Sequence, residues 1–259
     1  MSLAGKTYWL IGASEGLGRA LACELDKRGA KLVLSARSLG RLEALAGTLH
    51  PGTVALPMDV TNPESVASAH ADIGAIDGVI YAAGLYEPMR AQAWDTQTAT
   101  AICEVNFIGA MRCLGPLVRH FAQQNHGHIV IIGSLSGYRG LPGAIGYSAS
   151  KAAIMHLAEN MRADLWHTGV KVQLINPGFV KSRLSAKNQF RMPFLMDAGT
   201  AAALTCDAME RNRFKQDFPW LFSLVFRLGR FLPQWVYQRL FAPRPPGDGN
   251  PRTSPDMPG

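Results

Sequence analysis

Residues 7–18 read Thr-Tyr-Trp-Leu-Ile-Gly-Ala-Ser-Glu-Gly-Leu-Gly, a short apolar strand that runs into a glycine-rich turn. Glycine at positions 12, 16 and 18 permits a tight turn, lets the backbone approach a pyrophosphate, and allows a helix to pack closely on the sheet. The first turn of the following helix would present free N–H groups to the phosphates. Because a strand precedes the glycines and a helix-like segment follows them, the stretch predicts the first βαβ unit of a dinucleotide-binding fold.

The same alternation of apolar runs and helix-like segments continues to about residue 180. Short, nearly continuous apolar runs indicate strands that are covered on both faces, and strict alternation with helices indicates a parallel sheet. The expected fold class is α/β, a Rossmann-type doubly wound parallel β-sheet in a single domain over residues 1–242. The predicted strands are Thr7–Ile11, Lys31–Ser35, Thr53–Met58, Gly78–Ala82, His128–Ile132 and Val170–Ile175, and the predicted helices are Gly18–Arg28, Leu39–Leu49, Pro63–Ile73, Thr98–Gln124 and Ser148–His167.

The composition is that of a globular protein with one sizeable core, since 47% of the 259 residues are hydrophobic and 17% are charged. Four cysteines lie far apart, without a Cys-x-x-Cys pair or a histidine at metal-ligand spacing, so neither disulfides nor a metal site is expected. The N-terminus lacks the pattern of a signal peptide, and no window reaches the roughly 18 uncharged apolar residues of a transmembrane helix. These features predict a cytoplasmic protein.

The net charge of +7 is concentrated in the C-terminal part of the chain. Residues 183–259 hold eleven Lys or Arg against six Asp or Glu, and the basic residues are mixed with bulky apolar ones rather than gathered on a polar stripe. This distribution argues against a nucleic-acid partner. It leaves three interpretations open: a basic surface without a specific partner, an anionic cofactor, and a membrane surface.

The end of the second predicted strand bears on the choice of dinucleotide. A carboxylate at this place would hydrogen-bond the ribose hydroxyls of NAD and repel a 2′-phosphate, but the residue here is Ala36. Arg37 follows it, with a guanidinium that can grip a phosphate. Glu15 in the glycine loop is a mild argument against NADP, because some NADP enzymes carry a basic residue at this place. The sequence therefore predicts NADP as the cofactor, with NAD as the alternative.

Tyr147 and Lys151 form the strongest chemical signal in the chain. Positions i and i+4 share one face of a helix, so the lysine ammonium would lie close to the phenol. A free tyrosine has a pKa of about 10, and a neighbouring cation would lower that pKa toward the range in which the phenol can transfer protons. Ser134 lies at the end of the predicted strand His128–Ile132, at the edge where open α/β sheets place ligand-binding residues.

These residues together resemble the short-chain dehydrogenase/reductase family over about residues 5–182. The order and spacing of seven features match: the glycine loop, Asp59-Val60, Asn106, Ser134, Tyr147, Lys151 and Pro177-Gly178. The resemblance implies an enzyme that moves a hydride between a nicotinamide cofactor and a small carbonyl or alcohol. It also implies a homo-oligomer, a dimer or a tetramer.

The resemblance also implies individual roles. Ser134 would hydrogen-bond the substrate oxygen, Tyr147 would donate or accept the proton, and Lys151 would hold the ribose hydroxyls. Asn106 would anchor a water molecule of the proton relay. The implied cofactor-binding set is Gly12, Ser14, Glu15, Gly16, Leu17, Gly18, Arg37, Asp59, Val60, Ala83, Gly84, Tyr147, Lys151, Pro177, Gly178, Val180 and Ser182.

Two features depart from the family pattern. The family's Asn-Asn-Ala-Gly after the fourth strand is Tyr81-Ala-Ala-Gly84 here, so the asparagine that braces the sheet is missing. The family's frequent last strand, with its Gly-Gln and closing Asp-Gly-Gly, is expected to be absent as well. That second departure puts the usual C-terminal tetramer contact in doubt.

The C-terminal region differs in character from the rest. Residues 183–242 show no strong strand pattern and are expected to be helical or irregular, and the proline-rich residues 243–259 are expected to be disordered. Phe218–Phe241 contains eight aromatic residues and three arginines. Three interpretations remain open for it: a lid over an apolar substrate, a membrane contact, and a subunit interface. For the lid, we expect part of this segment to pack near the cleft with Arg227, Arg230 and Arg239 pointing outward.

The favoured function is therefore the reduction of an apolar carbonyl with NADPH, with Tyr147 as the general acid and base. Two alternatives stand beside it. One is a peripheral membrane-associated reductase of lipid carbonyls, and the other is a non-catalytic NADP(H)-binding scaffold or sensor.

Overall fold

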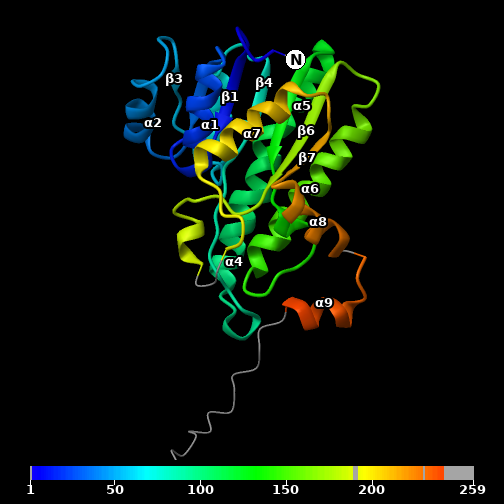
Figure 1. Ribbon diagram of the computed structural model, residues 1–259. Helices are drawn as coiled ribbons and strands as arrows, with labels where there is room; N and C mark the ends of the chain where they lie inside the picture. The colour runs from blue at the N-terminus through cyan, green and yellow to red at the C-terminus, as the bar shows by residue number, and fades with distance from the viewer. Residues whose placement is uncertain (1, 189–191, 230, 242–259) are drawn as a thin grey trace, which may run out of the picture.

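A parallel β-sheet of seven strands, in the order β3-β2-β1-β4-β5-β6-β7, runs through the molecule (Figure 1). The computed structural model describes residues 2–188, 192–229 and 231–241. The chain crosses from β3 back past β1 to β4, so the sheet is doubly wound, as the sequence predicts. The strands are β1 (Thr7–Ile11), β2 (Lys31–Ser35), β3 (Val54–Ala55), β4 (Gly78–Tyr81), β5 (Gly127–Ile132), β6 (Val170–Pro177) and β7 (Lys215–Phe218).

Helices cover both faces of this sheet (Figure 1). They are α1 (Gly16–Lys27), α2 (Leu39–Ala46), α3 (Pro63–Asp72), α4 (Thr96–Cys103), α5 (Gly109–Gln124), α6 (Ile145–Asp164), α7 (Ala198–Glu210), α8 (Trp220–Gly229) and α9 (Gln234–Phe241). A π-helical turn, η2 (Glu104–Ile108), joins α4 to α5. Short 3₁₀ turns are η1 (Ala91–Ala93), η3 (Leu135–Gly137) and η4 (Ser185–Lys187).

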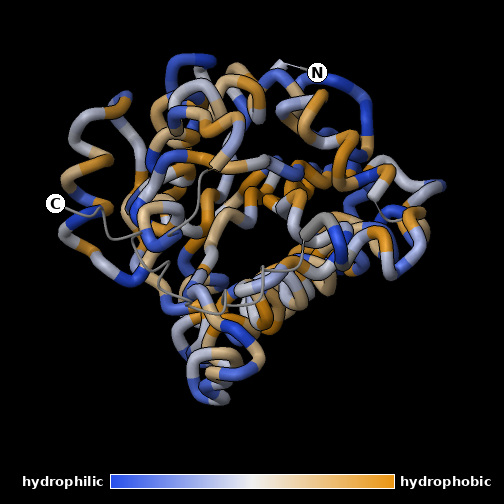
Figure 2. The backbone as a smooth tube through the Cα atoms, turned by 60° about the horizontal axis from the view of Figure 1, so that its bottom comes forward, coloured by the Kyte–Doolittle hydropathy of each residue, from blue (hydrophilic) through white to orange (hydrophobic). Residues whose placement is uncertain are grey.

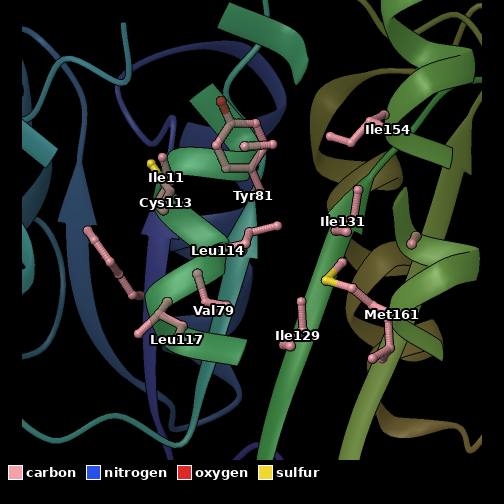
Figure 3. Close-up of a cluster of buried hydrophobic side chains, with 14 of the residues drawn as sticks. Ile11, Val79, Tyr81, Cys113, Leu114, Leu117, Ile129, Ile131, Ile154 and Met161 are labelled. Atoms are coloured by element: carbon pink, nitrogen blue, oxygen red, sulfur yellow. The ribbon is translucent and has the colours of Figure 1, made fainter. Parts of the chain in front are cut away.

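Successive residues of each central strand enter different hydrophobic cores. Trp9 and Ile11 of β1 pack with α3, α5 and α6, whereas Tyr8 and Leu10 of the same strand pack with α1, α2 and α7. The first core is shown in Figure 3, and Figure 2 shows hydrophobic residues gathered toward the interior with hydrophilic turns outside. Side chains alternate across a strand, so a strand that is covered on both faces must be apolar throughout. This explains the unbroken apolar runs in the sequence.

The six strands expected from the sequence are all present, with small changes at their ends. β3 is shorter than predicted because only Val54 and Ala55 pair with β2. The predicted long helix Thr98–Gln124 forms but is interrupted by the π-helical turn η2.

The expectation that residues 183–242 contain no strand is wrong. β7 pairs in parallel with β6, from Leu174 opposite Lys215 to Pro177 opposite Phe218. The segment Lys-Gln-Asp-Phe has a single apolar residue, so it gives no apolar run for sequence inspection to find. Its strand conformation comes from the free edge of β6, which is a tertiary contact.

One helical stretch in the described part of the chain, Thr96–Gln124, is long and apolar enough to cross a membrane by length and composition alone. It comprises α4, η2 and α5. Leu114, Leu117 and Phe121 of this stretch are buried in the core against the sheet. Core helices pass the same length and composition test, so this stretch is weak evidence of a membrane span.

Candidate active site

A cavity of about 1090 Å³ opens at the carboxyl ends of β1, β2, β4, β5 and β6. Open α/β sheets bind their ligands at this edge. Of the site residues predicted from the sequence, all except Asn106 line this one cavity: Gly12, Ser14, Glu15, Gly16, Leu17, Gly18, Arg37, Asp59, Val60, Ala83, Gly84, Ser134, Tyr147, Lys151, Pro177, Gly178, Val180 and Ser182.

The glycine loop has the shape that a dinucleotide requires. Gly12 has φ +96° and Gly16 has φ +53°, conformations that side-chain-bearing residues rarely adopt. A Cβ atom on Gly12 would lie 2.5 Å from the backbone nitrogen of Ala83, and one on Gly18 would lie 1.9 Å from the Gly12 carbonyl oxygen. α1 begins at Gly16 without a side-chain cap, so its first N–H groups face the cavity. This cradle fits a pyrophosphate.

The adenosine end of the cavity carries a group of charged residues. Arg37 is exposed on the cavity wall, and no hydrogen bond or ion pair joins its guanidinium to any other described residue. Glu15 pairs with Arg41 of α2 and with Arg183, whose Nη2 lies 2.8 Å from the carboxylate. The two arginines balance the charge of Glu15, the feature that weighed against a 2′-phosphate. The residues fit NADP.

Arg41 and Arg183 were missed by the sequence analysis, although both line the cavity. Arg41 stands four residues after Arg37 on the first turn of α2, and Arg183 directly follows the predicted segment that ends at Ser182. Their positions next to predicted site residues in the sequence could have identified them as part of the site. Their shared contact with Glu15 is set by how α2 and the segment after β6 meet the glycine loop.

Tyr147 and Lys151 both lie on α6 and face the cavity, as their spacing predicts. The Lys151 ammonium donates a hydrogen bond to the Ile132 carbonyl at 2.9 Å and lies 5.8 Å from the centre of the Tyr147 ring. Burial lowers the pKa of Lys151 to about 8. The pair therefore stands at the end of β5, next to Ser134.

The expectation that Lys151 lowers the pKa of Tyr147 is not met in this structure. Burial raises the pKa of Tyr147, and a hydrogen bond with the Ser134 hydroxyl opposes that rise only in part. The physical reason is that burial desolvates the phenol, while the Lys151 ammonium is hydrogen-bonded to the Ile132 carbonyl and lies 5.8 Å from the centre of the ring. The phenol therefore stays protonated at neutral pH.

Ser134 forms the N-cap of η3, directly after β5. Its Oγ accepts hydrogen bonds from the backbone N–H of Ser136 at 3.2 Å and from the Ser136 hydroxyl at 2.9 Å. Because it accepts from both groups of Ser136, its own proton is directed elsewhere, toward Tyr147 or toward a ligand in the cavity.

Asn106 is fully buried in the π-helical turn and does not line the cavity. Its Oδ1 accepts from the Leu85 backbone N–H at 2.7 Å, and its Nδ2 donates to the Leu85 carbonyl and to the Ser150 hydroxyl. Leu85 lines the cavity and Ser150 lies beside Lys151 on α6. The side chain therefore ties the cavity wall to α6, and the predicted role in a water relay remains a prediction.

Tyr81 takes over part of the bracing that the family's asparagine would supply. It is buried at the end of β4, and its hydroxyl donates to the Val105 carbonyl in the π-helical turn at 2.6 Å. Burial raises the pKa of Tyr81 well above its ordinary value, so this donor is permanent. The sheet is thus still joined to the helix that carries Asn106, by a different side chain.

Part of the cavity wall is apolar and comes from segments outside the predicted set. Phe222 and Phe226 of α8 pack with Leu135, Tyr138, Leu141 and Phe179 in a small hydrophobic cluster. Phe222, Val225 and Phe226 also line the cavity. The expectation that part of Phe218–Phe241 packs near the cleft is confirmed.

The arginines of this segment are partly as expected. Arg227 and Arg239 are exposed, although Arg227 also lies 3.9 Å from Asp217, and Arg230 is outside the described residues. The predicted disorder of residues 243–259 likewise concerns a part of the chain that the structure does not describe.

Comparison with known proteins gives the family. Residues 6–192 match the family model for short chain dehydrogenases. An uncharacterized oxidoreductase of Myxococcus xanthus is 36% identical over 90% of this chain and 94% of its own, and one of Mycobacterium tuberculosis is 31% identical over 89% and 95%. A crystal structure of a short chain dehydrogenase from Burkholderia cenocepacia in complex with NADP is 26% identical, with a TM-score of 0.81 over 94% of this chain and all of that chain. The chain belongs to the short-chain dehydrogenase family and is an oxidoreductase.

Proposed function

We propose that this short-chain dehydrogenase uses NADPH to reduce the carbonyl group of an apolar small molecule. The observation that carries the proposal is the single cavity that joins the glycine loop and Arg37 to Ser134, Tyr147 and Lys151. Ala36 leaves no carboxylate to repel a 2′-phosphate, and Arg37 has a guanidinium available to bind one. The similar structure from Burkholderia cenocepacia in complex with NADP supports the same cofactor.

In the proposed mechanism the nicotinamide ring, when bound, supplies the hydride to the carbonyl carbon. The Ser134 hydroxyl donates a hydrogen bond to the carbonyl oxygen, and the Tyr147 hydroxyl donates the proton that this oxygen needs to become an alcohol. Lys151, which lies on the same face of α6 as Tyr147, would hold the ribose hydroxyls. The Tyr147 phenol is protonated at neutral pH, as the donor of a proton to the carbonyl oxygen must be.

The substrate half of the cavity supports an apolar substrate. Phe179, Phe222 and Phe226 supply aromatic walls, and Val225 stands at the rim with 47% of its surface exposed. A cavity with such walls binds hydrocarbon by removing it from water, and excluding water also protects the hydride step. Long-chain aldehydes and ketones are the compounds that best match this wall.

The direct experiment follows the absorbance of NADPH with a panel of aldehydes and ketones of increasing chain length. We expect turnover that rises with chain length, and a lower activity with NADH. Cofactor binding without turnover of any compound in the panel would instead support the non-catalytic sensor. The two readouts, binding and turnover, keep these functions apart.

A second candidate function, peripheral contact with a membrane, is supported by the outer surface of α8 and α9. Trp220, Leu228, Phe231 and Trp235 are 70%, 62%, 78% and 70% exposed. Residues 218–241 contain three arginines and no acidic residue, which matches an anionic lipid surface. Figure 1 shows α8 and α9 together at one end of the molecule. Since α8 also lines the cavity, such contact would let a lipid carbonyl enter from the bilayer.

The test is co-sedimentation with vesicles of phosphatidylcholine alone and of phosphatidylcholine with phosphatidylglycerol. Binding to the anionic vesicles that falls with added salt is expected, and Trp235→Ser should reduce it. Trp166→Ser is the matched control, because Trp166 is 60% exposed beyond the end of α6. Absence of binding to both vesicles, together with a dimer or tetramer in solution, would favour the subunit interface.

A further inference from the structure

Asp217 is a buried carboxylate that the proposed chemistry does not use. It is the third residue of β7, and its side chain is 6% exposed. The Tyr138 hydroxyl donates to its Oδ2 at 2.7 Å, and the Asn176 Nδ2 donates to its Oδ1 at 2.8 Å. Arg227 Nε lies 3.9 Å from Oδ2. A buried charge with partners of this kind is specific in its geometry, because each partner must stay in place to offset the loss of water.

The three partners do not line the cavity themselves, but each belongs to a different segment whose neighbouring residues do. Tyr138 ends the η3 turn that begins after Ser134. Asn176 directly precedes Pro177 and Gly178, which line the cavity. Arg227 lies on α8, the helix that supplies Phe222 and Phe226 to the same cavity. Asp217 therefore joins the catalytic turn, the end of β6 and the aromatic helix.

The other contacts of α8 with η3 are mainly apolar. Phe222 and Phe226 pack against Leu135 and Tyr138, and such packing is strong but non-directional. The hydrogen bonds and the guanidinium contact at Asp217 are directional, so they fix the orientation of α8 relative to η3. Tyr138 takes part in both the apolar and the directional contacts. Burial, followed by the hydrogen bond to Asp217, raises the pKa of Tyr138 well above its usual range, so this donor keeps its proton at any physiological pH.

The geometry points to Asp217 as a positioning residue that holds α8 against the Ser134–Tyr138 segment and so sets which length of apolar substrate the cavity accepts. This inference rests on the proposed reduction of apolar carbonyls. Asp217 touches neither the cofactor loop nor Tyr147, so its effect should appear in the selection of substrates.

The experiment compares Asp217→Asn with Asp207→Asn on a short and a long aliphatic aldehyde. Asn keeps the shape of Asp and removes the charge, and Asp207 is a control on α7 that pairs with Arg28 on the opposite side of the sheet. For Asp217→Asn we expect KM for the long aldehyde to rise about tenfold, with a smaller change for the short one. The ratio of the two kcat/KM values is the readout, and NADPH affinity measured by fluorescence should not move.

A second measurement separates this inference from the proposed function. Hydrogen exchange of the α8 amides should be faster in Asp217→Asn and in Tyr138→Phe than in Asp207→Asn, whether or not an aldehyde is turned over. Unchanged exchange in α8, or an equal loss of kcat/KM on both aldehydes, would overturn the role of Asp217. A wild-type protein that reduces no aldehyde, with α8 exchange changed as expected, would contradict the proposed function alone.

Discussion

The segments before Ser182 and the helix α8 line the same cavity but are held in different ways. The glycine loop, Ser134, Tyr147 and Lys151 stand at the ends of central strands or on a helix packed against them. α8 has one face in the cavity, with Phe222 and Phe226 buried, and one face in solvent, with Trp220 and Leu228 exposed. The first region is fixed by the central strands, whereas only one face of α8 packs against the rest of the protein. Changes in the first should affect every substrate, and changes in the second should affect only some.

The largest effect is expected at Tyr147 in the first region. Tyr147→Phe removes only the hydroxyl, so fold and NADPH binding should persist while turnover falls by about 10²-fold or more for every substrate. Steady-state kinetics on short and long aldehydes check this. Tyr8→Phe is the control. The Tyr8 hydroxyl forms a hydrogen bond with His128, and Tyr8 lies outside the cavity, in the core formed with α1, α2 and α7. Wild-type turnover in Tyr147→Phe would show that the phenol is structural.

A second change tests the adenosine end of the same region. Arg37→Ala should weaken NADPH binding by about 1–3 kcal/mol, because a charged hydrogen bond to the 2′-phosphate is lost, and should leave NADH binding unchanged. Fluorescence titration with both cofactors measures it, with Arg119→Ala as the control for an exposed arginine on α5. Equal affinity of the unmutated protein for the two cofactors would contradict the role of Arg37.

The pH dependence of cofactor binding gives a smaller effect. Since the pKa of Lys151 is lowered to about 8, its ammonium is lost as the pH rises through that value. A hydrogen bond from a neutral amine is weaker, so Kd for NADPH should rise about fivefold between pH 7 and pH 9.5. Lys151→Met should show no such rise. A wild-type Kd that stays constant over this range would argue against contact between Lys151 and the ribose.

The same pKa has a consequence for stability with a definite sign. Lys151 has a lower pKa in the folded protein than the ordinary value of 10.5, so between about pH 8 and pH 10.5 the unfolded chain binds more protons. The contribution of this residue to the free energy of unfolding therefore rises with pH in that window.

The smallest effect is expected on the outer face of α8. Leu221→Ala should change the free energy of unfolding by less than about 0.5 kcal/mol, since Leu221 is 52% exposed. The adjacent Phe222→Ala removes a buried ring from the cavity wall, and should cost about 3 kcal/mol and raise KM for long substrates. Urea unfolding of the two variants measures the difference. Similar losses in both would mean that the outer face is covered, by lipid or by another subunit.

Much of the fold followed from local patterns. The apolar runs predicted six of the seven strands because those strands are covered on both faces, and the i, i+4 spacing placed Tyr147 beside Lys151 on one side of α6. β7 was not predicted because its residues are mostly polar and its partner is β6, far away in sequence. The buried position of Asp217 in β7 was therefore not predicted either.

The sequence predicted which residues line the cavity better than it predicted the contacts that these residues make. Glycine positions, strand ends and helix starts are local, so the residues lining the cavity were accessible from the sequence. Three features could not be read from the sequence. These are the hydrogen bonds of Asn106 to Leu85, the pairing of Glu15 with two arginines, and the raised pKa of Tyr147. Each depends on distances between segments that only packing brings together.

The sequence by itself thus determined the doubly wound parallel sheet, the cofactor loop and the pairing of Tyr147 with Lys151 on one helix, since these depend on short-range spacing and apolar periodicity. Only the tertiary structure decided that β7 joins the sheet, that α8 turns two phenylalanines into the cavity, and that Asp217 contacts residues of three separate segments. The physical reason is that burial and the field around a charge are set by neighbours distant in the chain, and these exist only once the chain has folded.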